Sequence, residues 1–330
     1  MTLMGEWSSR VSRFTQDDAG ALPLVMRRFH FFPLLMLALL PCRAFGQAAQ
    51  PSLVERFAGF SAITGFEQAV VDTILGELLP GAIRDRSGSA VLVIGSGAPR
   101  RLIACPLDEP GWVVGEVEAG GYLTLRRAPG RLPSPLFDQQ LEGHRVTLFG
   151  RWGPVPGVVA VRSVHLTRGR DAGVDAPFSV DDARVDVGAS AATGARALGV
   201  SVLTPVSLSK KPLRYGSDLL AAPMSGRRAA CAALVLSARE AKPATGTVVV
   251  AFVTEQNLSE RGLRTVRRTQ GPFVEERLVD GGAGVPGVPV ETAEGWLLPA
   301  AYTTTAVETV SLPGADSLRA RIGRWIAGIP

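Results

Sequence analysis

An apolar run leads directly into acidic residues and a Pro-Gly turn in the stretch LIACPLDEPG, residues 102–111. Short apolar runs bounded by turn residues are typical of strands that are buried on both faces. A second run of this kind, AVLVI at residues 90–94, ends at the turn Gly95-Ser96-Gly97. We therefore predict two buried strands joined by a turn, with Asp108 and Glu109 following the second strand.

Helical patterns surround these strands. Apolar residues recur at helical spacing within residues 51–80, and Pro80-Gly81 ends that pattern. After about residue 180 the pattern predicts helices and strands in alternation: helices at 191–198, 229–241 and 318–326, and strands at 184–188, 247–253, 297–302 and 308–312. Residues 264–294 are polar and rich in glycine and proline, so we expect little strand structure there.

The pattern of apolar and turn residues changes between these two parts of the chain. From Trp112 to about Pro177, short strand-like runs alternate with glycine and proline turns, without a helical period. We predict a small all-β module, a barrel, inserted into an α/β domain. The predicted boundaries are residues 47–111 for the first part of that domain, 112–178 for the inserted barrel and 179–330 for the second part.

Residues 1–46 have the features of an export signal. Met26-Arg27-Arg28 is a short basic region, Phe31–Leu40 is an apolar run, and Ala44-Phe45-Gly46 fits a cleavage site. We expect Met26 to be the true start and the mature protein to be periplasmic or extracellular. The alternatives are an N-terminal membrane anchor and, because of Cys42, a lipoprotein signal.

The composition excludes several classes of protein. Hydrophobic residues make up 46% of the 330 residues and charged residues 20%, which is a globular composition and not a disordered one. The formal net charge of +5 is small and is spread along the chain, so we expect no nucleic-acid partner. Once the leader is removed, we expect no membrane partner either.

The predicted mature chain contains Cys105 and Cys231. Free cysteine packs as a small hydrophobic residue, so we expect two buried thiols. The alternative is a single disulfide, which an oxidising compartment would permit.

Several motifs occur in an order that is similar to one known family. Thr64-Gly65-Phe66-Glu67 is similar to Ser-Gly-(Phe/Tyr)-Glu, and Asp85 with Gly88-Ser89 to Asp-x-x-Gly-Asn. Residues 102–111 are similar to a strand that runs into His-Met-Asp-Glu-Pro-Gly, and residues 185–200 to Asp-Ile-Gly-Ala-x-Ser followed by Ala-x-x-Leu-Gly-Ile. By these motifs the chain resembles the tetrahedral and glutamyl aminopeptidases, some of which are labelled cellulases or endoglucanases.

The resemblance covers most of residues 51–330 and implies a fold and a chemistry. The implied fold is a three-layer α/β zinc-peptidase-like domain with an inserted β-barrel that helps to build dimers and larger shells. Members of the family normally hold two divalent metals, and a glutamate near the metals acts as a general base on a metal-bound water. Histidines and carboxylates hold the metals.

The residues that fall on this metal site carry little of its chemistry. The resemblance places the histidine of His-x-Asp on Pro106 and retains its aspartate as Asp108. It places the remaining ligand and base positions on residues that are not ionisable: the bridging aspartate on Gly226, the base and ligand glutamates on Gln256 and Asn257, and the late histidine on Thr304. The last ligand aspartate has no match.

We therefore predict a degenerate pocket with no catalytic residues and no cofactor. Glutamine and asparagine amides form hydrogen bonds, but they cannot act as a base near neutral pH. His144 and His165 have no visible partner cluster, and we interpret both as structural. Glu255 and Glu260 flank the amide pair and would be bases only in a shifted register. Asp108 is expected to accept backbone N–H bonds or to pair with an arginine such as Arg228.

Three functions remain open at this stage. The favoured hypothesis is an exported pseudoenzyme that acts by binding a peptide or small molecule, or by assembly as a homo-oligomer through the barrel. The second is an active aminopeptidase with an unusual ligand set for a divalent metal such as zinc or cobalt. The third is a partner subunit that modifies the assembly of an active paralogue.

Overall fold

The computed structural model describes residues 51–131, 134, 136–161 and 177–329. These residues all fall within one structural unit. The predicted leader and His165 lie outside the described residues.

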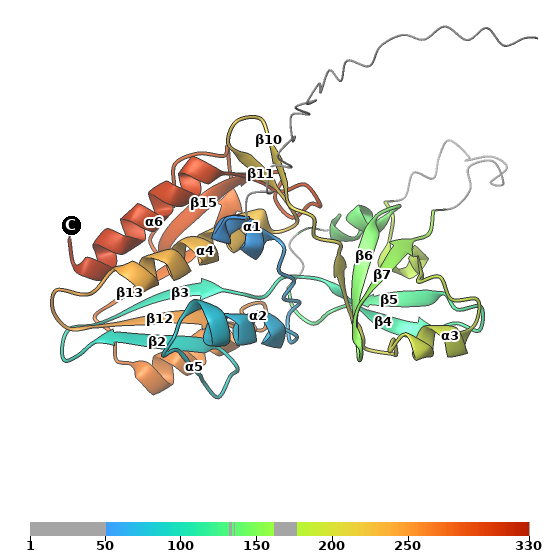
Figure 1. Cartoon of the computed structure of the whole chain (residues 1–330), viewed down its shortest axis with the longest axis horizontal. Coiled ribbons are helices and arrows are strands. Elements are labelled where there is room, and N and C mark those ends of the chain that lie inside the picture. The colour runs from blue at the N-terminus through green and yellow to red at the C-terminus, as the bar shows by residue number, and fades with distance from the viewer. Residues whose placement is uncertain (1–50, 132–133, 135, 162–176, 330) are drawn as a thin grey trace, which may run out of the picture. The chain divides into compact units, whose positions relative to one another are not determined.

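A ten-stranded mixed sheet organises the larger part of the molecule (Figure 1). Its order is β1 (Ile83–Arg84), β2 (Ala90–Gly95), β12 (Thr247–Val253), β3 (Arg100–Pro106), β13 (Glu275–Ala283), β15 (Gly295–Ala301), β16 (Thr309–Ser311), β11 (Leu219–Ala221) and β10 (Leu213–Tyr215), with β14 (Val290–Glu291) paired to β15. The four central strands β12, β3, β13 and β15 are parallel, so their carboxyl ends share one edge of the sheet. All seven residues of β12 are buried, as expected for a strand that is covered on both faces.

Helices cover both faces of this sheet and complete three layers. One face packs against α1 (Leu53–Ala58), α2 (Gln68–Thr73), the π-helical turn η1 (Ile74–Leu78), α4 (Ser225–Glu240) and α6 (Leu312–Ala327). The opposite face packs against α5 (Arg261–Gln270), through Leu263 and Val266. Figure 1 shows α4 and α6 above the sheet and α5 below it. The three-layer α/β prediction is confirmed.

The smaller part is a closed six-stranded barrel. Its strands follow the order β4 (Trp112–Val117), β5 (Leu123–Arg127), β8 (Arg184–Asp186), β7 (Gly153–Val159), β6 (Arg145–Gly150) and β9 (Pro205–Leu208), and β9 closes onto β4. The 3₁₀ turns η2 (Phe137–Leu141) and η3 (Val180–Asp182) and the helix α3 (Ala192–Ala197) add to this part.

The predicted end of the barrel at residue 178 is therefore too early. The segment 184–188, which we expected in the α/β domain, forms β8 between β5 and β7, and β9 provides the last strand of the closed barrel. Barrel closure depends on pairing between strands that lie far apart in sequence, which the local pattern does not encode. His144 precedes β6 and is exposed.

The segment after Leu263 is the largest error of the sequence-based secondary structure. Residues 264–294 contain most of α5, the nine-residue strand β13 and the short strand β14. The sequence EERLVDGGA of β13 does not alternate and is only partly apolar. Its conformation is set by parallel pairing with β3 on one side and β15 on the other.

Cys105 and Cys231 form a disulfide with an S–S distance of 2.02 Å, so the expectation of two free thiols is wrong. Cys105 lies on β3 and Cys231 on α4, which brings residues separated by 126 positions together behind the carboxyl edge of the sheet. Over the part of the chain that the structure describes, no helix combines the length and apolar character needed to cross a membrane.

Candidate functional site

The mapped positions gather at the carboxyl edge of the parallel strands. Pro106 is the last residue of β3, and Asp108 follows it. Gln256 and Asn257 follow β12, Gly226 is the second residue of α4, and Thr304 follows β15. Crevices beyond the carboxyl ends of parallel strands are the usual ligand sites of α/β sheets. The structure therefore brings the predicted pocket residues to one edge of the sheet.

Asp108 is completely buried and joins three segments of the chain. Its Oδ2 accepts hydrogen bonds from the Thr64 hydroxyl at 3.0 Å and from the Asn257 backbone N–H at 2.8 Å. The Asn257 side-chain amide donates to the Thr64 hydroxyl at 3.0 Å. The predicted role of Asp108, accepting a backbone N–H, is confirmed. Its arginine partner is Arg227, with a separation of 3.8 Å, and not the predicted Arg228.

Glu255 and Glu67 support the loop that carries the amide pair. Glu255 adopts a left-handed backbone conformation with φ of 53°, and its carboxylate lies 2.9 Å from the Arg261 guanidinium. The buried Glu67 carboxylate accepts the Glu255 N–H at 2.9 Å. Burial raises the pKa of Glu67 above its ordinary value, and the hydrogen bonds from the Glu255 and Gly65 N–H groups oppose the rise. Both carboxylates thus have structural partners.

Gly226 is held at the start of α4 by a buried carboxylate that the sequence analysis missed. The Gly226 N–H donates to Glu308 Oε1 at 2.7 Å, and the Thr304 N–H donates to Glu308 Oε2 at 2.9 Å. A Cβ atom added at Gly226 would lie 3.0 Å from Glu308 Oε1 and 3.0 Å from the Gly281 Cα atom. Burial, aided by the charge of Asp280, raises the pKa of Glu308.

Arg227 carries the positive charge of this edge. Its Nε and Nη2 donate to the two oxygens of Asp280, at 2.8 and 2.7 Å, in a bidentate pair. Its Nη1 donates to the Asp108 backbone carbonyl. Burial would lower the pKa of Arg227, but Asp280 and Asp108 hold it above its ordinary value. A cleft of about 240 Å³ opens above this pair, lined also by Met224, Thr304 and Glu308.

A second ionic cluster lies next to the first. The buried Glu109 carboxylate accepts hydrogen bonds from Lys210 Nζ, from Arg228 Nη2 at 2.8 Å and from the Ala62 N–H at 3.1 Å. Burial would raise the pKa of Glu109, but Lys210 and Arg228 hold it below its ordinary value. Burial lowers the pKa of Lys210 to about 8, and Arg228 contributes to this decrease.

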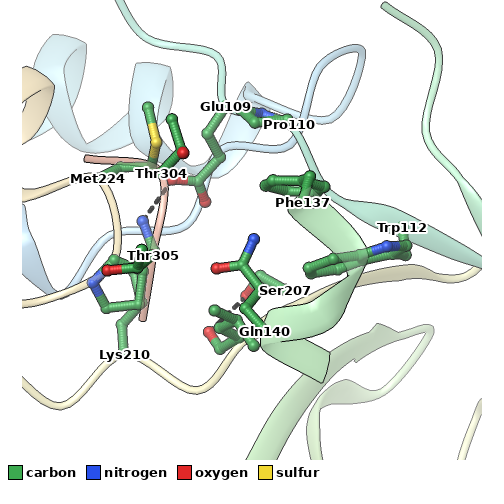
Figure 2. Close-up of a pocket in the computed structure, with 12 residues that line it drawn as sticks. Glu109, Pro110, Trp112, Phe137, Gln140, Ser207, Lys210, Met224, Thr304 and Thr305 are labelled. Carbon is green, nitrogen blue, oxygen red and sulfur yellow. Dashed lines mark hydrogen bonds and ion pairs between the residues drawn. The ribbon is translucent and has the colours of Figure 1, made fainter. Parts of the chain in front are cut away.

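Figure 2 shows a narrow cavity beside this cluster, with Glu109 and Lys210 on one side and the rings of Trp112 and Phe137 on the other. The two rings stack with centroids 4.9 Å apart. The cavity measures about 20 Å³, which is space for roughly one water molecule. The wider cleft above Arg227 is therefore the better candidate for a ligand.

A family model described as M42 glutamyl aminopeptidase matches residues 88–272, which is more than half of the chain. The chain belongs to this family. An Escherichia coli protein named as an aminopeptidase, SgcX, is 35% identical over 53% of the chain and 47% of its own length. The lysyl aminopeptidase of Pyrococcus furiosus is 26% identical over 64% of the chain and 59% of its own length. This M42 chain thus spans only about half to three fifths of these relatives.

Solved structures confirm the M42 fold. The TET1 peptidase of Pyrococcus horikoshii superimposes with a TM-score of 0.71, with 84% of this chain and all of that chain covered. Its sequence identity is 18%, so the likeness concerns the fold alone. The predicted resemblance to tetrahedral and glutamyl aminopeptidases is confirmed at the level of family and fold.

The donors at this edge do not fit the pair of metals that the resemblance implies. Proline, glycine and threonine stand at mapped ligand positions, and a longer side chain at Gly226 would meet Glu308 and Gly281. The carboxylate of Asp280 is already paired with the Arg227 guanidinium, at 2.7 Å, and so is not free to bind a metal. In the described parts of the chain, no three His, Cys, Asp or Glu side chains are grouped closely enough to hold a metal ion.

Sequence reasoning missed the charged residues that now define this edge: Arg227, Asp280, Glu308 and Lys210. Asp280 lies in the segment where no strand was expected, and Glu308 lies in the loop before β16. The signal that was available was the pair Arg227-Arg228 in the first turn of a helix, where the helix dipole disfavours cations. Such a pair indicates carboxylate partners elsewhere in the chain.

Proposed function

We propose that this M42 protein is exported, holds no catalytic metal and acts by binding or assembly instead of peptide hydrolysis. The observation that carries this proposal is the loss of ionisable groups at Pro106, Gly226, Gln256, Asn257 and Thr304, all near one edge of the sheet. A peptidase of this class requires a metal-activated water and a general base. Amides at positions 256 and 257 supply neither a base nor an anionic ligand.

The Cys105–Cys231 disulfide supports export. Disulfides persist in oxidising compartments and are rare in the cytosol of mesophiles. The basic, apolar and small-residue segments within residues 26–46 are consistent with this, since together they resemble a secretory signal. We therefore propose a periplasmic or extracellular location for the mature protein.

Assembly as a homo-oligomer is the partner interaction that we propose. The TET1 peptidase of Pyrococcus horikoshii can assemble into a tetrahedron or a large octahedral shell. The inserted barrel of this chain exposes Trp152 at the β6–β7 turn, together with Val202 and Leu203. We propose that the barrel makes the contact between subunits. Light scattering that gives a monomer mass would contradict it.

An active metallo-aminopeptidase is the second candidate. The observation in its favour is that Asp108, Asp280 and Glu308 all remain at the carboxyl edge, near the mapped ligand positions. Hard divalent cations prefer such oxygen ligands. This candidate requires Arg227 to leave Asp280.

The experiment that separates the two is elemental analysis of the purified protein after exposure to zinc, cobalt and manganese and then desalting, with peptide turnover measured on the same samples. We expect metal at background level and no turnover. The matched control is the double variant Gln256→Glu with Asn257→Glu, which we also expect to stay metal-free because the other ligands are missing. One or two equivalents of metal in the natural chain would overturn the proposal.

A further inference from the structure

We propose that the Arg227 guanidinium is a built-in cation that supplies the positive charge required by the carboxylates at this edge. The inference deepens the proposed function and rests on it, because a metal pair and this guanidinium would compete for the same carboxylate. It assigns to Arg227 a role that no position of the predicted site carried.

The geometry matches that of a cation held by two strands and a helix. Asp280 belongs to β13, Asp108 follows β3, and Arg227 is in the first turn of α4. The pairing of β13 with β3 ends where Leu278 lies opposite Ala104. After that point, no residues of these two described strands are paired with each other. Arg227 contacts both Asp280 and the segment after β3, so it connects β13 to β3 beyond their last pair.

The environment makes this charge necessary. Asp108 is fully buried, and the Asp280 side chain is 22% exposed, so leaving either carboxylate without a cation would carry a large desolvation penalty. The fork of a guanidinium fits a carboxylate in a bidentate manner that a lysine cannot reproduce. The Arg227 side chain is itself only 13% exposed and is almost enclosed by these partners.

The position of Arg227 argues against a solvated surface residue. The first turn of a helix disfavours cations, because the free backbone N–H groups concentrate positive potential there. Arg227 nevertheless lies in the first turn of a 16-residue helix. Its carboxylate partners are Asp280, 53 residues away, and Asp108, 119 residues away at 3.8 Å. Those carboxylates offset the unfavourable interaction of Arg227 with the helix dipole. A side chain that served only to fill space would not need carboxylate partners.

The test is charge compensation, measured as thermal midpoints in EDTA. We expect R227Q to lower Tm by about 5 °C, because breaking a partly exposed ion pair costs less than breaking a fully buried one, and a domain of this size shifts by about 2–4 °C per kcal/mol. The double variant R227Q/D280N removes the unpaired carboxylate as well, and we expect it to recover at least half of that loss. R319Q, in the exposed Arg319–Glu240 pair, is the matched control and should change little.

Two results would overturn the inference. One is an R227Q protein with the Tm of the natural chain. The other is an R227Q/D280N protein whose loss of Tm equals the sum of the losses of R227Q and D280N measured separately. Additive losses would indicate that Arg227 acts through packing and not through its charge. If R227Q does not fold, R227K provides the comparison, and we expect it to be less stable than the natural chain and more stable than any folded R227Q/D280N. Metal uptake by the natural chain would contradict the proposed function separately, since all of these Tm values are measured in EDTA.

Discussion

Two ionic clusters lie next to each other at the carboxyl edge of the sheet and are built from adjacent residues. Asp108 and Arg227 belong to the cluster under the open cleft, whereas Glu109 and Arg228 belong to the cluster beside the barrel. The first includes the partly exposed Asp280, and the second includes Lys210, whose side chain is 3% exposed. Asp108 and Glu109 are neighbours in the loop after β3, and Arg227 and Arg228 are neighbours in α4. A shift of one residue in each segment therefore separates the ion pair that faces the cleft from the ion pair that is sealed from solvent.

This difference separates two uses of buried charge. The sealed cluster connects the two parts of the molecule, because Lys210 follows the last barrel strand and Arg228 lies in α4. The cleft-facing cluster occupies the edge where the family resemblance places metal ligands. We therefore expect changes in the sealed cluster to affect stability most, and changes near the cleft to have smaller effects.

The largest effect is expected for Arg228→Met. Arg228 is fully buried and bonds both the Glu109 carboxylate and the Leu107 carbonyl, the latter at 2.6 Å. Removing one partner of a buried pair costs about 3–5 kcal/mol, so we expect a loss of this size in the free energy of unfolding, measured in urea. A loss below about 1 kcal/mol would mean that the sealed cluster does not connect the two parts.

The pH dependence of stability tests the same cluster through Lys210. The pKa of Lys210 falls from 10.5 to about 8 on folding, so between these values the unfolded chain binds a proton that the folded chain does not. Stability from this group therefore rises with pH across that window, by about 3 kcal/mol in total. The groups that act on Lys210 are Glu109, Arg228 and Glu308.

The measurement is the unfolding free energy of the natural chain and of Lys210→Met at pH 7.5, 9 and 10. We expect the natural chain to gain stability relative to the variant as the pH rises. Lys211→Met is the matched control, because Lys211 is its exposed neighbour. Parallel pH profiles for the natural chain and Lys210→Met would contradict the burial of this amine.

The smallest effect is expected for Asn257→Ala near the cleft. This change removes the side-chain hydrogen bond to Thr64 but keeps the backbone N–H that Asp108 accepts. A hydrogen bond of this kind contributes about 1 kcal/mol, and we expect that loss in urea unfolding. A loss as large as that of Arg228→Met would remove the distinction between the two clusters.

The fold was largely predictable, because its central strands carry their own signal. Residues 90–94, 102–105 and 248–253 are continuous apolar runs, and each lies in a strand. The second and third runs are fully buried, whereas only Ala90 and Val91 are buried in the first. The strand β13 was not predictable, because a sequence as polar as EERLVDGGA becomes a strand only when β3 and β15 are already in place. The end of the barrel was missed for the same reason, since β8 and β9 contribute only a few residues each.

The candidate site was predictable only in part. Pro106, Gly226 and Thr304 could be assigned to one pocket, because the family resemblance maps each of them onto a metal-ligand position. The charge partners could not be placed, since Arg227 lies 119 positions from Asp108 and 53 positions from Asp280, and no local spacing connects them.

The sequence alone determined the α/β class, the inserted β module, the family resemblance and the residue types at the mapped positions. These depend on local patterns of apolar residues and on short motifs, which each segment contains in full. Only the tertiary structure decided which arginine pairs with Asp108, that Cys105 bonds to Cys231, and that β13 completes the centre of the sheet. Ion pairs, disulfides and strand registers depend on distances of a few ångströms between distant segments, and those distances exist only once the chain is packed.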